Sequence, residues 1–360
     1  MFTRNPGTWH RAAKPAAILL AFSCGVMLFP TAGTRTYFPP FTPFASFLDV
    51  QAAGAPQAQP TAKPAPAAQQ PPQQKDVPYR ITRDVNLVVL LASVVDSQKR
   101  FVPNLRQESF RVYEDKIEQK LSVFRREDIP ITLGLVVDNS GSMRDKREKV
   151  NSAALTIVKT SQRDDQVFVV NFNDEFYLDL DKDFTNDPIE LREALERIDS
   201  RGSTAMYDAV IGSLDHAKKG TRDKKILLVI TDGEDNASRK TLEVAVEEAH
   251  KSDAVIYAIG LLSQESKREA KHARKALEAL STATGGKPFF PESVQDVESI
   301  CMQIANDIRN QYVLAYYPTN MAKDGSFRAV HVDVISPRGL GKLEVRTRTG
   351  YYAQRASAGM

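Results

Sequence analysis

Five side chains that end in oxygen lie at three separated places in the 360-residue sequence, and together they could hold a metal ion. The first place contributes Asp138, Ser140 and Ser142, the second contributes Thr204, and the third contributes Asp232. Two carboxylates and three hydroxyls make a hard, all-oxygen ligand set. Such a set suits Mg²⁺, which prefers octahedral oxygen coordination and keeps several of its waters.

The predicted strands would place these side chains in loops at one edge of a sheet. Residues 131–137 and 226–230 are apolar runs, and each run is typical of a buried parallel strand. Asp138 and Asp232 follow these runs, and open α/β sheets bind their ligands in loops beyond the ends of such strands. Residues 138–141 could also be only a turn that ends a strand. That interpretation leaves the other two segments unexplained.

Strands and helices alternate from residue 131 to residue 309, which predicts a doubly wound, mostly parallel sheet flanked by helices. The predicted strands cover residues 131–137, 166–171, 226–230 and 255–259, with an edge strand at 175–180. The predicted helices cover residues 147–161, 188–198, 205–218, 242–251, 267–280 and 294–309. The fold class is therefore α/β.

Short alternating segments on both sides of this region predict a small β-rich domain. They are residues 86–95, 110–114 and 117–124 before it, and 311–316, 328–335 and 342–347 after it. Each flank is too small to make a stable sheet alone. We therefore expect flank 77–128 to pair with flank 311–354, with the α/β domain of residues 129–310 inserted between them. Two unpaired extensions that pack on the α/β surface are the alternative.

The five oxygen-bearing residues resemble the metal-ion-dependent adhesion site (MIDAS) of von Willebrand factor A (VWA) domains. The resemblance covers about residues 130–310 and rests on the segments DNSGSM, GSTAMYDA and VITDGED. It implies a VWA, Rossmann-like fold with three hydroxyl ligands, and two carboxylates that act directly or through metal-bound water: Ser140, Ser142 and Thr204, then Asp138 and Asp232. It also implies that a Glu or Asp of a protein partner fills the open coordination position. The ion would be Mg²⁺, with Mn²⁺ or Ca²⁺ as alternatives.

The flanks extend this resemblance to a bacterial group of exported VWA-related proteins, which carry short β segments on both sides of the domain. That group is defined by sequence and not by a common activity, so it bears on fold more than on function. Directly after Asp232, Glu234, Asp235 and Asn236 form either a rim for the ligand or simply a polar loop.

The first 76 residues have a different composition from the rest. Arg4, Arg11 and Lys14 precede an apolar run at 15–29, the pattern of a secretory signal and short for a membrane span. We expect a cleaved signal in residues 1–30, with an uncleaved anchor as the alternative. Residues 31–76 are rich in Pro, Ala and Gln, which predicts a disordered spacer. The expected location is secreted, periplasmic or at the cell envelope.

The charge balance argues against nucleic-acid binding, and the cysteine count argues against a disulfide. The 48 basic and 45 acidic residues leave a net charge of +3, too balanced to indicate nucleic-acid binding or a polybasic membrane contact. Cys24 and Cys301 are the only cysteines, so we expect no disulfide in the mature protein.

The sequence carries no catalytic signature. It contains no GxSxG around Ser140 or Ser142, no HExxH, no P-loop, and no GxGxxG after a strand. We therefore predict no catalytic residues, and an exported module for adhesion or scaffolding that binds protein through a cation. One alternative is a VWA assembly factor that works with a chaperone ATPase. Others are a hydrolase whose metal is held by Asp138 and Asp232, and a domain with a purely structural metal.

Overall fold

A six-stranded sheet forms the centre of the α/β part of the chain. The computed structural model describes residues 87–126, 128–197 and 199–355, and orders these strands β10-β9-β8-β5-β6-β7. Their bounds are β5 (Ile131–Asp138), β6 (Gln166–Phe172), β7 (Phe176–Leu178), β8 (Lys224–Thr231), β9 (Ala254–Gly260) and β10 (Pro288–Phe289). All neighbours pair in parallel except β7, which is antiparallel to β6. The predicted fold class is confirmed.

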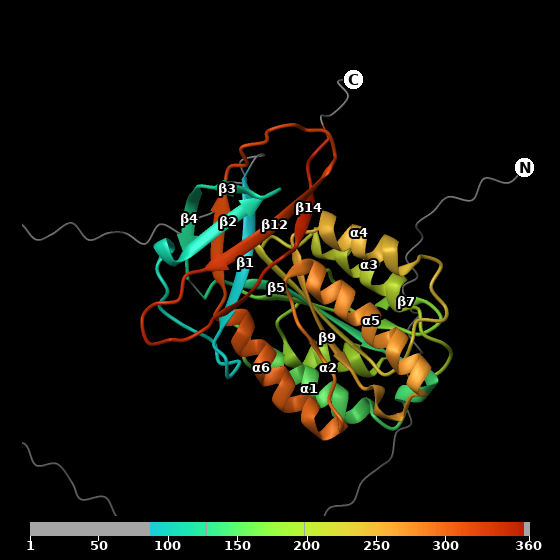
Figure 1. The fold of residues 1–360 in the computed structure, drawn as a ribbon. Coiled ribbons are helices and arrows are strands. Elements are labelled where there is room, and N and C mark those ends of the chain that lie inside the picture. The colour runs from blue at the N-terminus through green and yellow to red at the C-terminus, as the bar shows by residue number, and fades with distance from the viewer. Residues whose placement is uncertain (1–86, 127, 198, 356–360) are drawn as a thin grey trace, which may run out of the picture. The chain divides into compact units, whose positions relative to one another are not determined.

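Helices cover both faces of this sheet (Figure 1). One face packs against α1 (Arg147–Lys159), α2 (Pro188–Glu196) and α6 (Val297–Arg309). The other packs against α3 (Met206–Ala217), α4 (Leu242–Lys251) and α5 (Lys267–Thr284). Every residue of β5 and β8 is buried. Strands covered on both faces favour apolar residues at successive positions, which explains the apolar runs at 133–137 and 226–230 within these strands.

Strands from before and after the α/β part pair with one another in two further sheets. One has the order β13-β1-β11-β4 and the other β14-β12-β2-β3. The strands are β1 (Val88–Val95), β2 (Phe110–Glu114), β3 (Ile117–Gln119), β4 (Leu121–Arg125), β11 (Tyr312–Tyr316), β12 (Phe327–Val334), β13 (Glu344–Arg346) and β14 (Gly350–Tyr352). Leu90 and Tyr312 of the first sheet share a buried cluster with Phe110 and Val332 of the second. The alternation along β12, buried at every second residue, reflects this one-sided packing.

One predicted strand is divided in the structure. Residues 117–124 form β3 and β4, which belong to different sheets, with Lys120 between them. The side chain of Gln119 fixes the end of β3, because its amide donates to Thr319 Oγ1 over 3.1 Å and accepts from the Thr319 backbone over 3.0 Å. The prediction of one strand was wrong, since this anchor comes from 200 residues away in the sequence.

The predicted signal (1–30) and spacer (31–76) lie outside the described residues. Among the helices that the structure describes, none combines the length and the apolar character needed to cross a membrane.

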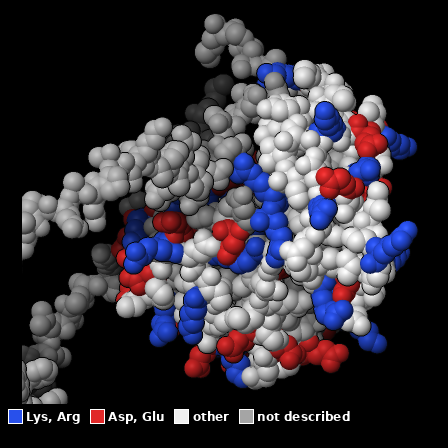
Figure 2. Space-filling model, turned by 90° about the vertical axis from the view of Figure 1, so that its left-hand side faces the viewer, with Lys and Arg blue, Asp and Glu red and all other residues white. Residues whose placement is uncertain are grey.

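Charges of both signs are mixed on the face that Figure 2 shows, with a short run of basic side chains near its middle. This mixture follows from the nearly equal numbers of basic and acidic residues. The visible part of this face therefore presents no broad field of one sign.

Candidate metal-binding site

The order of strands in the main sheet changes direction at β5. The chain adds β6 on one side of β5 and β8 on the other. Open α/β sheets bind their ligands at such a reversal, beyond the carboxyl ends of the strands. Asp138 is the last residue of β5, and Asp232 directly follows the end of β8. The topology therefore brings the two predicted carboxylates to one edge of the sheet.

Hydrogen bonds link three of the predicted ligands from two loops. Ser140 Oγ lies 3.1 Å from Ser142 Oγ, and Ser142 Oγ donates to Asp232 Oδ1 over 2.8 Å. Ser140 and Asp232 are buried, whereas Ser142 is exposed. This group of oxygens therefore opens to solvent at Ser142, where an ion and a partner could reach it.

Asp138 is fully buried, and both of its carboxylate oxygens accept hydrogen bonds. Oδ1 accepts from the backbone N–H of Ser140 over 2.7 Å, and Oδ2 accepts from the Thr231 hydroxyl over 2.5 Å. Burial raises the pKa of Asp138 to about 6, against the lowering effect of the bonds from Thr231 and Ser140. Each carboxylate oxygen has two lone-pair sites, so Asp138 retains capacity toward an ion or its waters.

Thr204 is placed beside the Asp232 loop, but the hydrogen bonds described above do not include it. Its side chain is buried, and its Oγ1 lies 3.9 Å from the point where a Cβ at residue 233 would be. Glycine at position 233 therefore keeps the space next to the Thr204 hydroxyl open. All five predicted ligands come from loops or strand ends at this one edge.

Two of the predicted rim residues, Asp235 and Asn236, stabilise the loop that carries Thr204. Asn236 Oδ1 accepts from the Thr204 N–H over 2.9 Å, and the Thr204 carbonyl accepts from the Asn236 N–H over 3.0 Å. Asp235 Oδ2 accepts from the Tyr207 N–H over 2.8 Å, near the start of α3. Glu234 pairs with His272 Nδ1 at 2.8 Å. The polar loop after β8 thus positions the segment that carries Thr204.

Two basic residues next to the site were missed by the sequence analysis. Lys146 Nζ lies 2.5 Å from Asp232 Oδ2. Arg147 Nη1 donates to the backbone carbonyl of Asp138 over 3.1 Å, and burial lowers the Arg147 pKa to about 10. Their only sequence signal is that they lie four and five positions after Ser142, where α1 begins.

Asn139 is a third residue at the site that the sequence did not indicate. Its backbone N–H donates to the carbonyl of Phe172, at the end of β6, over 2.6 Å. Its carbonyl accepts from the N–H of Arg201, in the loop before Thr204, over 2.9 Å. Its side chain is fully buried, and neither amide atom has a hydrogen-bond partner in the described part of the chain. Bound ions or waters are a common reason for such a buried, unpaired polar group.

The ligand chemistry fits a hard cation. Within the described residues, no three His, Cys, Asp or Glu side chains gather closely enough to hold a metal ion, so hydroxyls would have to supply further ligands. Mg²⁺ is usually bound by only one or two carboxylates, with waters completing its shell. The ligand set of this site would be Ser140, Ser142, Thr204, Asp138 and Asp232.

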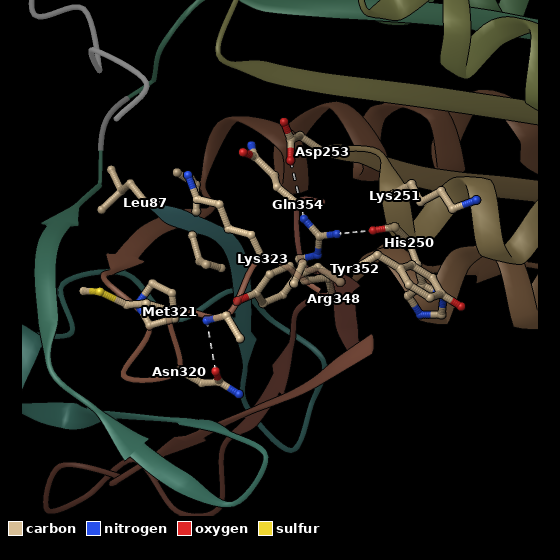
Figure 3. A pocket seen from close by; sticks show the side chains of 16 residues that line it. Leu87, His250, Lys251, Asp253, Asn320, Met321, Lys323, Arg348, Tyr352 and Gln354 are labelled. Atoms are coloured by element: carbon tan, nitrogen blue, oxygen red, sulfur yellow. Dashed lines mark hydrogen bonds and ion pairs between the residues drawn. The ribbon is translucent and has the colours of Figure 1, made fainter. Parts of the chain in front are cut away.

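A pocket of about 220 Å³ between the β part and the end of α4 contains none of these residues (Figure 3). Arg348 projects into it from the segment between β13 and β14. Its guanidinium donates to the carbonyls of His250 and Gly350 and lies 3.6 Å from Asp253. Because this cation is already paired within the chain, the pocket is a weaker candidate for a ligand site.

Residues 133–303 match the family model of the von Willebrand factor type A domain. The matched region contains all five predicted ligands. The chain is also 31% identical over 108 residues to an uncharacterized protein of Synechocystis sp.. That alignment covers 29% of this chain and 26% of the relative, so this chain matches about a quarter of the relative's length.

Several solved structures are similar at low sequence identity. The PilB minor pilin from Streptococcus sanguinis is 13% identical with a TM-score of 0.43, over 51% of this chain and 62% of the pilin. The vWF domain of the pili tip protein Mfa5 from Porphyromonas gingivalis is 13% identical with a TM-score of 0.42, over 50% of this chain and 95% of the Mfa5 domain. A von Willebrand factor type A protein from Catenulispora acidiphila is 13% identical with a TM-score of 0.44, over 71% of this chain and 76% of the Catenulispora protein.

Proposed function

We propose that the von Willebrand factor type A domain of this chain binds an acidic group of a partner protein through a divalent cation of the Mg²⁺ type. The observation that carries this proposal is the meeting of oxygens from separate loops. Ser142 Oγ contacts both Ser140 Oγ and Asp232 Oδ1, at the exposed edge of the sheet where its strand order reverses. The module would serve adhesion or scaffolding.

The charges around the site support an acidic partner. The carboxylates of Asp138 and Asp232 lie next to two cationic side chains, Lys146 and Arg147. The hydroxyls of the site add no charge. When bound, a divalent cation would supply two positive charges and a coordination position open to a partner's carboxylate. Because the hydroxyl ligands add no negative charge and Arg147 lies next to Asp138, the loaded site would keep a net positive charge and attract that group.

A non-enzymatic role is part of the same proposal. Two of the groups next to the five ligand side chains are engaged within the chain: Thr231 donates to Asp138, and Lys146 pairs with Asp232. Hydrolysis would need a general base in reach of a bound water. An extracellular or cell-envelope location completes the proposal and rests on the sequence pattern of residues 1–30.

Calorimetric titration with Mg²⁺, Mn²⁺ and Ca²⁺ tests the cation site. Asp138→Asn keeps the shape of the side chain and removes its charge, so we expect an affinity loss of about 100-fold or more, equivalent to about 3 kcal/mol. Thr204→Ala should weaken binding only about tenfold, because a water can replace one neutral ligand. Ser203→Ala removes a hydroxyl from the same loop outside the predicted ligand set, and its affinity should be unchanged.

Recognition of an acidic group needs a separate measurement. A peptide with a single Glu side chain is compared with its Gln counterpart, in Mg²⁺ and in EDTA. We expect weak binding of the Glu peptide, in about the millimolar range, in Mg²⁺ only. Wild-type cation affinity in Asp138→Asn, or peptide binding that persists in EDTA, would contradict the proposal.

A further inference from the structure

The ammonium group of Lys146 lies inside the candidate metal site. Its Nζ is 2.5 Å from Asp232 Oδ2, with the two side chains 12% and 0% exposed. The other oxygen of Asp232 accepts from Ser142 Oγ over 2.8 Å. Both oxygens of this carboxylate are therefore engaged by the chain itself, one of them by a full positive charge.

This pair differs from the other lysine pairs among the described residues. Lys182–Glu190 and Lys218–Asp215, for example, have both partners more than 40% exposed. Solvent screens such surface pairs, and their net contribution is small. The sheltered position of Asp232 leaves the attraction of Lys146 much less screened. Removing either partner would leave the other charge poorly solvated, so the pair is expected to be held firmly.

We infer that Lys146 is an internal cation that occupies the site when no metal ion is bound, and that it sets the affinity for divalent cations by competing for Asp232. This inference rests on the proposed function, since it concerns the same site. Lys146 directly precedes α1 and has a flexible four-carbon stem, which allows the ammonium to swing toward solvent when an ion takes its place.

Competition lowers affinity in a calculable way. Only molecules in which Lys146 has left Asp232 can accept an ion there, and the apparent dissociation constant rises as that fraction falls. If about one molecule in ten is open, the ion binds about tenfold more weakly than it would to an unobstructed site. The same contact would balance Asp232 in the metal-free protein, so we expect the domain to fold without an ion.

The test compares Lys146→Met with Lys149→Met in titrations with Mg²⁺ and Mn²⁺ and in thermal melts. Lys149 is exposed on α1 three residues further on, so its substitution removes the same charge from the neighbourhood without opening the site. We expect Lys146→Met to bind both ions about tenfold more tightly than wild type, to melt at a lower temperature without metal, and to gain more from added metal. Lys149→Met should behave as wild type.

A second variant, Lys146→Gln, is included in case Lys146→Met does not fold. The glutamine amide can still donate to Asp232 but carries no charge. Tighter ion binding in Lys146→Gln supports the inference even if Lys146→Met does not fold. Equal affinity in wild type, both Lys146 variants and Lys149→Met would overturn it while leaving the metal site in place. Absence of ion binding in every protein would instead overturn the proposed function, and the inference with it.

Discussion

Lys224 shows most clearly how a buried charge affects this protein at the scale of one residue. It is the first residue of β8, it is buried, and its ammonium donates to the carbonyl of Ile308 near the end of α6. Burial lowers its pKa to about 7, and the nearby Arg309 lowers it further. The acidic neighbours that act in the opposite direction are Asp307, Asp128 and Asp165.

The sign of this shift predicts how stability depends on pH. The Lys224 pKa is about 7 in the folded protein and about 10.5 without the fold. Between these values the unfolded chain binds more protons, so stability should rise with pH, by about 2 kcal/mol from pH 7 to pH 9. Below pH 7 the lysine is charged in both states and the full penalty of burying it remains.

Urea unfolding of Lys224→Met at pH 6.5, 7.5 and 8.5 checks this prediction. The methionine keeps the apolar stem and cannot titrate, so the rise in stability with pH should be smaller than in wild type. Lys219→Met, at an exposed position, serves as the control and should follow the wild-type curve. Parallel curves for wild type and Lys224→Met would show that Lys224 does not titrate in this range.

At the scale of elements, the apolar pattern predicted the helices of the α/β part and all strands of its sheet except the two-residue β10. The helix predicted at 242–251 has the bounds of α4, and the one predicted to end at residue 280 continues to Thr284 in α5. Local periodicity determines these elements because each packs one face on the sheet. The division between β3 and β4 could not be predicted in this way, since it depends on the contact of Gln119 with Thr319.

In the candidate site, too, local features could be predicted from the sequence and long-range contacts could not. Its oxygen ligands are recognisable from residue types next to strand ends, because each segment is local. The contacts that position them are not local: Lys146 reaches Asp232 from 86 residues away, and Asn236 reaches Thr204 from 32 residues away. No periodic pattern marks such pairs, so the structure was needed to find them.

The loop after β8 provides a prediction at this scale. Asn236→Ala removes the acceptor for the Thr204 N–H, and so the segment that carries Thr204 should loosen. We expect cation affinity to fall about fivefold, with a stability loss of about 1 kcal/mol, the usual effect of one hydrogen bond. Calorimetric titration and urea unfolding measure the two effects. Asn236→Asp keeps an acceptor and should retain cation affinity; equal losses in both variants would count against the bracing role.

At the scale of the whole molecule, a buried polar network joins the α/β part to the β part. Asp307 Oδ2 of α6 accepts from Tyr257 of β9 and from Arg346 of β13, each over 2.9 Å. Gln311, between α6 and β11, donates to the Tyr257 hydroxyl over 3.2 Å and to Ser93 of β1 over 3.3 Å. Buried polar groups that share partners in this way are costly to separate. The described residues also form one compact unit by their contacts.

This network predicts that the two parts unfold together. In scanning calorimetry, residues 87–355 should unfold in one transition. The calorimetric and van't Hoff enthalpies of that transition should agree. Asp307→Ala leaves Arg346 without its carboxylate and Tyr257 without its acceptor, so the whole transition should move down, by about 3 kcal/mol of unfolding free energy. Gln303→Ala, at an exposed position one turn earlier on α6, should leave the transition unchanged. Two wild-type transitions, of which Asp307→Ala shifts only one, would mean that the α/β part and the β part are independently stable and that the network does not couple them.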